Sequence, residues 1–157
     1  MKAHTKEDEL KVISRVLEET AFIFSDLMES YDMPKIDKRD AKGVTLTFKG
    51  DPSGELHLWA GDDFVRVTAA NMLGIDEQAP DAVEKGIDAL KELLNIIVGN
   101  YLTEIYGTDQ IYDLGIPDVL SVDSLSDDFK NSEAIWLTAE DCPILVVVKT
   151  NDKSSDR

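Results

Sequence analysis

The sequence is poor in cysteine, histidine and basic residues, and each scarcity narrows what the chain can do. Cys142 is the single cysteine and cannot form an internal disulfide, so we interpret it as a small buried hydrophobe. His4 and His57 stand alone, which is too little to specify a zinc site or a Ser-His-Asp triad. We interpret His57 as an ordinary strand side chain. The glycines are scattered at turns and helix ends, so the sequence contains neither a Walker loop nor a dinucleotide fingerprint.

Basic residues number 16 against 32 acidic ones, which gives a net charge of −16. This excess of negative charge disfavours nucleic acids and anionic membranes and suits a partner with a basic surface. The acidic runs at 61–63 and 126–128 lack the alternating oxygen spacing of a calcium loop, so we interpret them as helix caps and solvated loops. We therefore expect no metal or cofactor on this chain.

No apolar run is long enough to span a bilayer, and the N-terminus lacks the pattern of a signal peptide. We therefore expect the protein to be cytoplasmic. A chain of 157 residues is long enough to bury a sizeable core. We expect one domain over residues 1–150 and a flexible tail over 151–157.

Helical periodicity is strongest in two segments. Apolar residues recur every three or four positions over residues 5–30, where Thr5 and Asp8 resemble a capping box and residues 32–34 end the pattern. The second segment spans residues 82–106, between Pro80 and Gly107, with Gly86 as its weak point. Residues 62–73 fit a strand or a helix. We choose the helix, because Asp62 can serve as its N-cap and Gly74 as its stop.

Two hairpins and an edge strand complete the pattern. Residues 44–48 and 56–60 alternate as strands around an expected type I turn at 51–54. Residues 114–122 predict a strand, and Pro117, which lacks a backbone donor, places it at a sheet edge or a bulge. The last hairpin joins 134–138 to the apolar run 144–149 through residues 140–143, and that apolar strand is expected to be central.

These elements predict an α/β (α+β) fold. Two long helices, about 6–30 and 81–106, should pack on one antiparallel or mixed sheet of about six strands.

The helix over 82–106 carries a short polar ridge. At 100° per residue, Asp88, Glu92, Asn95 and Gly99 fall within roughly 60° of each other, opposite an apolar stripe that should be buried. We expect the ridge to face solvent. Asparagine has a low helix propensity in the middle of a helix, so a reason other than helix propensity should account for Asn95 at this position. Its carboxamide cannot act as a base, but it can fix the position of a water molecule.

Around the ridge the chain resembles the chemotaxis phosphatases of the CheX, CheC and FliY family. That family's motif has an Asp or Ser, a Glu four residues on, an Asn three further, and a Pro some twenty residues downstream. Those places are taken here by Asp88, Glu92, Asn95 and Pro117. The runs NIIVGN at 95–100 and MLG at 72–74 are also similar to the family. The resemblance covers residues from about 40 to 150 and is nearest to the CheX branch, because only one intact copy of the motif is present.

The resemblance implies a phosphatase that hydrolyses the aspartyl phosphate of a CheY-type response regulator. Asn95 would orient the attacking water, and Glu92 would dock against a lysine of the regulator. Asp88, Gly99 and Pro117 would contact the partner. The regulator would supply Mg²⁺ and the lysine, and the chain would form a homodimer.

CheC-type members of the family carry two such helices related by pseudo-symmetry. Placing Glu18 over Glu92 puts Ser14 over Asp88 and Ala21 over the asparagine position, so the first copy is expected to be degenerate. Two other hypotheses remain open at this point. The chain could bind a response regulator or flagellar-switch component without hydrolysis, or it could be a structural dimer whose ridge is ordinary surface.

Overall fold

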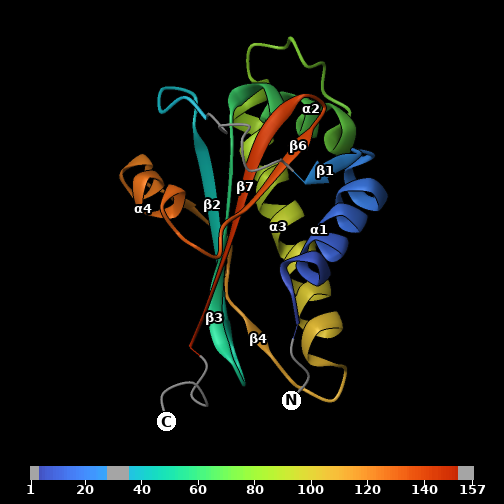
Figure 1. Ribbon diagram of the computed structural model, residues 1–157. Helices are drawn as coiled ribbons and strands as arrows, with labels where there is room; N and C mark the ends of the chain where they lie inside the picture. Colours follow the sequence, from blue (N-terminus) through green and yellow to red (C-terminus); the bar gives the residue numbers. More distant parts are fainter. Residues whose placement is uncertain (1–3, 28–35, 152–157) are drawn as a thin grey trace.

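The computed structural model describes residues 4–27 and 36–151 (Figure 1). Its helices are α1 (Lys6–Ala21), α2 (Asp62–Leu73), α3 (Ala82–Tyr106) and α4 (Leu125–Phe129), with a 3-10 turn at Val122–Ser124. Its strands are β1 (Ser25–Leu27), β2 (Lys42–Lys49), β3 (Ser53–Ala60), β4 (Asp113–Leu114), β5 (Asp118–Leu120), β6 (Ile135–Ala139) and β7 (Cys142–Asn151). The strands form one sheet in the order β1-β6-β7-β3-β2-β4, with β5 also paired to β2. All of these pairs are antiparallel, so the predicted α+β class is confirmed.

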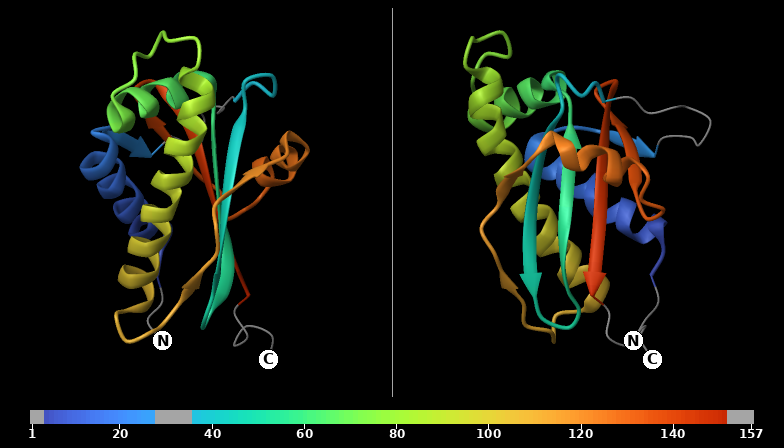
Figure 2. Two further views of the ribbon diagram at one scale, coloured as in Figure 1. Left: turned by 180° about the vertical axis from the view of Figure 1, so that it is seen from behind. Right: turned by 90° about the vertical axis from the view of Figure 1, so that its left-hand side faces the viewer.

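The helices cover the two faces of the sheet unequally. Among the described residues, the helices α1, α2 and α3 lie on one face, and the short α4 lies on the other (Figures 1 and 2). The main core fills the first interface, with side chains such as Leu17, Leu94 and Leu56 fully buried. A smaller core of Ile36, Trp59, Leu125, Leu145 and Val147 lies on the second face. No helix within 4–27 and 36–151 has the length and apolar character needed to cross a bilayer.

Helix α3 spans the predicted residues and ends at Gly107, which has φ 91°. Gly86, expected to weaken it, is explained by packing. A Cβ at Gly86 would lie 2.6 Å from the carbonyl oxygen of Val65, so glycine is needed for α2 and α3 to approach closely. Residues 62–73 form the helix that we chose over a strand.

Helix α1 is shorter than predicted. Its capping box at Thr5 is present, but it ends at Ala21 rather than near residue 30, because Phe22 adopts a left-handed conformation. The chain then turns, and residues 25–27 pair with β6. Phe24, which periodicity assigned to the buried stripe, is 71% exposed. At residues 25–27, backbone hydrogen bonding to β6 thus outweighs the helical periodicity of the sequence. The predicted end at 32–34 lies outside the described residues, as does most of the expected tail, 152–157.

Both hairpin turns differ from prediction. Ser53 and Gly54 already belong to β3, where they pair with the end of β7, so a type I turn at 51–54 is wrong and the reversal lies at 50–52. In the second hairpin only Glu140 and Asp141 form the turn, both at positive φ. Cys142 and Pro143 belong to β7. As predicted, β7 is central, between β3 and β6. The expected strand at 114–122 is split into β4 and β5 on either side of Pro117.

The helix α4 was not predicted, and a buried carboxylate joins it to the sheet. Asp128 is 0% exposed, although we interpreted residues 126–128 as solvated. Its Oδ2 lies 2.7 Å from Nδ1 of His57 and accepts a hydrogen bond of 2.6 Å from Trp59 Nε1, while Nζ of Lys149 lies 3.1 Å from Oδ1. Nε2 of His57 lies 2.7 Å from Glu55 Oε2. We call these five residues the α4 latch.

The latch shifts the pKa values of both central groups. Burial acts to lower the pKa of His57, but the hydrogen bonds to Asp128 and Glu55 raise it above its ordinary value. Burial acts to raise the pKa of Asp128, but the bonds from His57 and Trp59 hold that pKa at about 2. Because each ring nitrogen of His57 lies 2.7 Å from a carboxylate oxygen, we expect both to donate, which requires the protonated imidazole. It is not the simple strand side chain that we predicted.

The latch should make stability depend on pH. A raised histidine pKa contributes stability that is complete below about pH 6.5, the unfolded value, and is lost as pH rises through the folded pKa. The lowered pKa of Asp128 contributes stability that is lost as pH falls toward about 2. Urea titrations above pH 6.5 should show the free energy of unfolding falling by at most about 1.4 kcal/mol per pH unit for this proton.

The variant His57→Gln separates the contribution of His57 protonation to stability from the contributions of the other titrating groups. Its free energy of unfolding should lack the extra decline above pH 6.5 that the parent chain shows. The latch would not carry the pH dependence if the two curves stayed parallel from pH 5.5 to 9.

Candidate functional site

The polar ridge of α3 faces outward. Asp88 and Glu92 are exposed, while Asn95 and Gly99 are half-buried. Between them in sequence, Leu90, Leu94 and Ile97 are fully buried. The apolar stripe thus fixes the rotation of the helix, and the ridge is presented to solvent by the packing of the opposite side.

Asn95 is unusual because its carboxamide is not used within the chain. Among the described residues, no hydrogen bond engages its side chain. Asn100, one and a half turns along the same helix, shows the contrast. Its Nδ2 donates to the carbonyl of Ile96 at 2.9 Å, and its Oδ1 accepts from Arg15 at 3.1 Å. Asn100 therefore has a structural role, whereas the donor and acceptor of Asn95 are available to a ligand.

The acidic residues of the ridge are also unpaired. In the described part of the chain, neither Asp88 nor Glu92 forms an ion pair, and Lys85, one turn before, is bound to Asp81 at 3.1 Å. Two carboxylates and one carboxamide thus line a helix face without internal partners. No group of three or more histidine, cysteine or acidic side chains in this described part is arranged to hold a metal ion.

Gly99 has no structural reason to be glycine. A Cβ at this position would meet nothing within 4 Å, in contrast to the crowded Gly86. Glycine in mid-helix costs about 1 kcal/mol relative to alanine. The open space beside Gly99 leaves room for the backbone of a second molecule to approach the helix.

Pro117 comes from a different element. It lies between β4 and β5, on the sheet edge that pairs with β2, and α3 packs over β2. Its neighbour Ile116 is 89% exposed. The structure therefore gathers four of the five predicted residues on one helix face and holds the fifth on this edge segment.

The matching face of α1 lacks a carboxamide. Glu18 is exposed, but Ala21 is buried and carries no polar group. Ser14 accepts a hydrogen bond of 3.0 Å from Ser25, so its hydroxyl is engaged within the chain. The observed side chains agree with the expectation of a degenerate first copy.

Sequence reasoning missed the contacts that align α1 with α3. Arg15 donates to both carboxylate oxygens of Glu104 and to Asn100, and it forms an ion pair of 3.2 Å with Glu19 on its own helix. The hydrogen bond from Arg15 holds the pKa of Glu104 below its ordinary value. Both side chains are partly exposed, so the pair contributes less than about 1 kcal/mol and serves mainly to set the register of the two helices.

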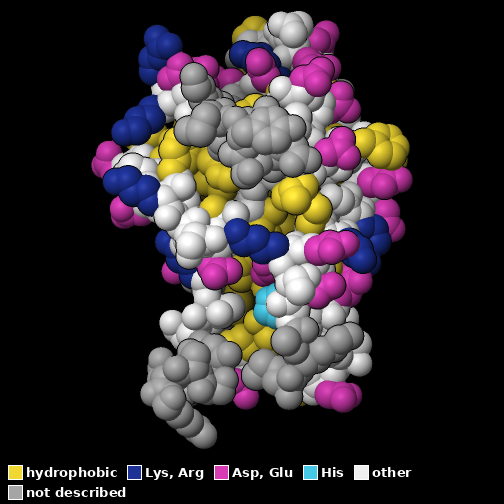
Figure 3. All heavy atoms as spheres, viewed as in Figure 1, with side chains coloured by type: hydrophobic (Ala, Val, Ile, Leu, Met, Phe, Trp, Pro, Cys, Tyr) yellow, Lys and Arg dark blue, Asp and Glu magenta, His cyan; other side chains and the backbone are white. Residues whose placement is uncertain are grey.

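Charged side chains are spread over the protein surface rather than gathered in one patch. Figure 3 shows acidic side chains distributed over the face seen there, with Lys and Arg interspersed. With a net charge of −16, a docking partner with a basic surface would be attracted from a distance.

One family model matches the chain. The family model described as "Chemotaxis phosphatase CheX" matches residues 43–140, which include the ridge and Pro117. The comparison with curated proteins gave no match.

Solved structures with the same fold cover nearly the whole chain. CheX in the CheX-CheY-BeF3-Mg²⁺ complex from Borrelia burgdorferi is 18% identical, with a TM-score of 0.67 over 96% of this chain and 99% of that chain. CheX from Vibrio vulnificus is 14% identical, with a TM-score of 0.67 over 96% and 100%. CheX from Desulfovibrio desulfuricans is 15% identical, with a TM-score of 0.65 over 92% and 97%. At these identities the likeness shows a common fold. Since the family model also matches more than half of the sequence, the chain belongs to the CheX family of chemotaxis phosphatases.

Proposed function

We propose that this protein hydrolyses the aspartyl phosphate of a CheY-type response regulator, with Asn95 ordering the attacking water and Glu92 docking a lysine of the regulator. The observation that carries the proposal is the free carboxamide of Asn95, one turn from an exposed and unpaired glutamate. Membership of the family supports the reaction class. The Borrelia burgdorferi structure, in which CheX is complexed with CheY, BeF3 and Mg²⁺, supports the class of partner.

The chemistry asks little of the phosphatase beyond positioning. A water oxygen attacks phosphorus in line as the bond from phosphorus to the aspartyl oxygen breaks. The products are a free carboxylate and inorganic phosphate. The protons of the attacking water stay on the phosphate. The transition state is loose and the leaving carboxylate needs no acid, so an ordered water and neutralised phosphoryl oxygens are the main requirements. Asn95 meets the first by hydrogen bonding, and Mg²⁺ and lysine on the regulator meet the second.

The remaining ridge residues would shape the docking surface. Asp88 adds a second unpaired carboxylate, Gly99 leaves space for a partner backbone, and Pro117 stands on the neighbouring edge segment. We place the reaction in the cytoplasm and expect the protein to act as a homodimer.

Glu92→Ala should weaken both docking and hydrolysis, because a charge-assisted pair across the interface is lost. We expect the Kd for a beryllofluoride-activated regulator to rise by about tenfold, or 1.4 kcal/mol. Glu18→Ala is the matched control, since Glu18 is also an exposed helical glutamate but belongs to the degenerate copy. Fluorescence titration and phosphate release should separate the variants. If Glu92→Ala and Glu18→Ala lost the same amount of regulator affinity, the total negative charge of the protein, and not the ridge, would set that affinity.

Gly99→Ala should make the protein more stable and the complex weaker. Alanine should add about 0.5–1 kcal/mol to the free energy of unfolding, because the added methyl group meets nothing within 4 Å among the described residues. The same methyl group would obstruct a partner backbone and raise the Kd for the regulator. Urea unfolding and the same fluorescence titration measure the two effects. Gly86→Ala should instead destabilise the fold, and unchanged regulator affinity in Gly99→Ala would remove Gly99 from the interface.

A further inference from the structure

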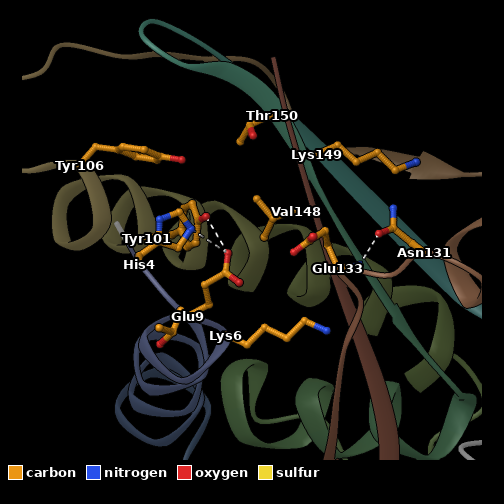
Figure 4. Close-up of a pocket in the computed structure, with 11 residues that line it drawn as sticks. His4, Lys6, Glu9, Tyr101, Tyr106, Asn131, Glu133, Val148, Lys149 and Thr150 are labelled. Carbon is orange, nitrogen blue, oxygen red and sulfur yellow. Dashed lines mark hydrogen bonds and ion pairs between the residues drawn. The ribbon is translucent and has the colours of Figure 1, made fainter. Parts of the chain in front are cut away.

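A cleft of about 520 Å³ lies away from the ridge, beside the start of α1 and the ends of α3 and β7. Figure 4 shows Glu9 and Tyr101 on one side of it, Glu133 on the other, and Val148 and Thr150 along β7. Its volume lies within the range of sites for small molecules, about 300–1,000 Å³. The proposed phosphatase chemistry uses none of these residues.

Glu9 is the most distinctive group in the cleft. It is only 6% exposed, and its Oε2 accepts a hydrogen bond of 2.8 Å from the hydroxyl of Tyr101. Nε2 of His4 lies 3.6 Å from the same oxygen. Burial raises the pKa of Glu9, the hydrogen bond from Tyr101 and the nearby His4 act to lower it, and Glu133 acts to raise it, so that the pKa lies above its ordinary value. The cost of burying this carboxylate thus exceeds the stabilisation that Tyr101 and His4 supply.

The lysines of the cleft do not supply the missing charge. Nζ of Lys6 donates to the backbone carbonyls of Ser132 at 2.9 Å and Ala134 at 3.3 Å. Lys149 is ion-paired with Asp128 in the α4 latch. Figure 4 shows both ammonium groups directed away from Glu9, whereas the carboxylate of Glu133 points into the cleft. Lys6 and Lys149 also line the cleft, but their ammonium groups are engaged by these partners, so Glu9 and Glu133 are the charged groups there that a cationic ligand can pair with.

Aromatic rings line the cleft beside Glu9. Tyr101 and Tyr106 meet edge to face at 6.2 Å, and His4 lies 6.3 Å and 5.9 Å from their ring centroids. Rings of this kind attract organic cations through their electron-rich faces, and they also contact the carbon atoms of such ligands. Buried carboxylate and aromatic ring together favour a nitrogen cation over an inorganic one.

We propose that this cleft binds a small organic ammonium ion, whose nitrogen pairs with Glu9 and whose carbon chain lies against Tyr106 and Val148. A second amine on the ligand would be met by Glu133 at the rim. Pairing with a cation favours the ionised form of Glu9, so binding should weaken as the pH falls and Glu9 becomes protonated.

Isothermal titration of the full chain with 1,5-diaminopentane tests the proposal. The parent protein should bind with a Kd of about 0.1–1 mM, that is, about −4 to −5.5 kcal/mol. Glu9→Gln should raise the Kd at least about tenfold, since the charge is lost while the amide oxygen can still accept from Tyr101. The uncharged analogue 1,5-pentanediol should not bind.

Glu7→Gln is the matched control, because Glu7 is an exposed residue of the same helix, 4.0 Å from Lys11 and outside the cleft. It removes the same charge and should leave the Kd unchanged. Glu133→Gln should weaken binding by about threefold, and it provides a second variant if Glu9→Gln fails to fold in circular dichroism. Equal weakening in Glu7→Gln and the cleft variants, or no saturable binding by the parent chain, would overturn the proposal.

Discussion

Asn95→Ala is expected to abolish most of the acceleration of regulator dephosphorylation while leaving binding of the regulator nearly unchanged. The carboxamide has no partner in the described part of the chain, so its removal leaves the fold intact and takes away only the groups that hold the water. We expect a loss of at least about 100-fold in rate, which corresponds to about 2.7 kcal/mol of transition-state stabilisation. Phosphate release under saturating regulator measures it.

Two further substitutions sharpen this result. Asn95→Asp keeps the shape but places a negative charge against the phosphoryl group, so it should be no more active than the alanine variant. Asn100→Ala is the control, because that asparagine is engaged by Arg15 and Ile96 within the chain. It should lower stability and leave the rate unaffected. Full activity in a folded Asn95→Ala would contradict the proposed mechanism.

Asp128→Ala is expected to have the largest effect on stability. The substitution leaves the buried imidazole of His57 without one of its two carboxylate partners, and it removes the acceptor of Trp59. Breaking a buried pair in this way typically costs about 3–5 kcal/mol. Chemical denaturation at pH 6 should show this loss as a lower midpoint.

Asp127→Ala is the control for the latch, because Asp127 is the exposed neighbour on the same short helix. It should change the free energy of unfolding by less than about 0.5 kcal/mol. Because α4 covers the sheet face opposite α3, folded Asp128→Ala should still dephosphorylate the regulator. A loss of stability no greater than that of Asp127→Ala would mean that the latch contributes little.

Local patterns predicted the elements whose packing agrees with their periodicity. The helix over 82–106 is the best case, because its apolar stripe, its end at Gly107 and its outward ridge all follow from spacing. Helix α1 differs because Phe22 turns left-handed and residues 25–27 pair with β6, which lies more than 100 residues away in sequence. Such distant pairing leaves no local signal. The same holds for Asp128, whose partner His57 is 71 positions earlier.

The candidate site divides in the same way. Periodicity placed Asp88, Glu92 and Asn95 on one face, but the role of each came from the family resemblance, since polar helix faces are common. The contact of Arg15 with Glu104 was not predictable, because it depends on how two helices cross. The cleft at Glu9 was also missed. Its parts come from both ends of the chain, and a glutamate in the first turns of a helix is ordinarily interpreted as solvated.

The most direct test of the account is the release of inorganic phosphate from a purified, phosphorylated CheY-type regulator with catalytic amounts of this protein. The account predicts many turnovers per chain, at a rate well above that of the regulator alone, and loss of this acceleration in Asn95→Ala. Tight binding of the activated regulator with no acceleration of phosphate release would contradict it, and the chain would then be a binding module without phosphatase activity.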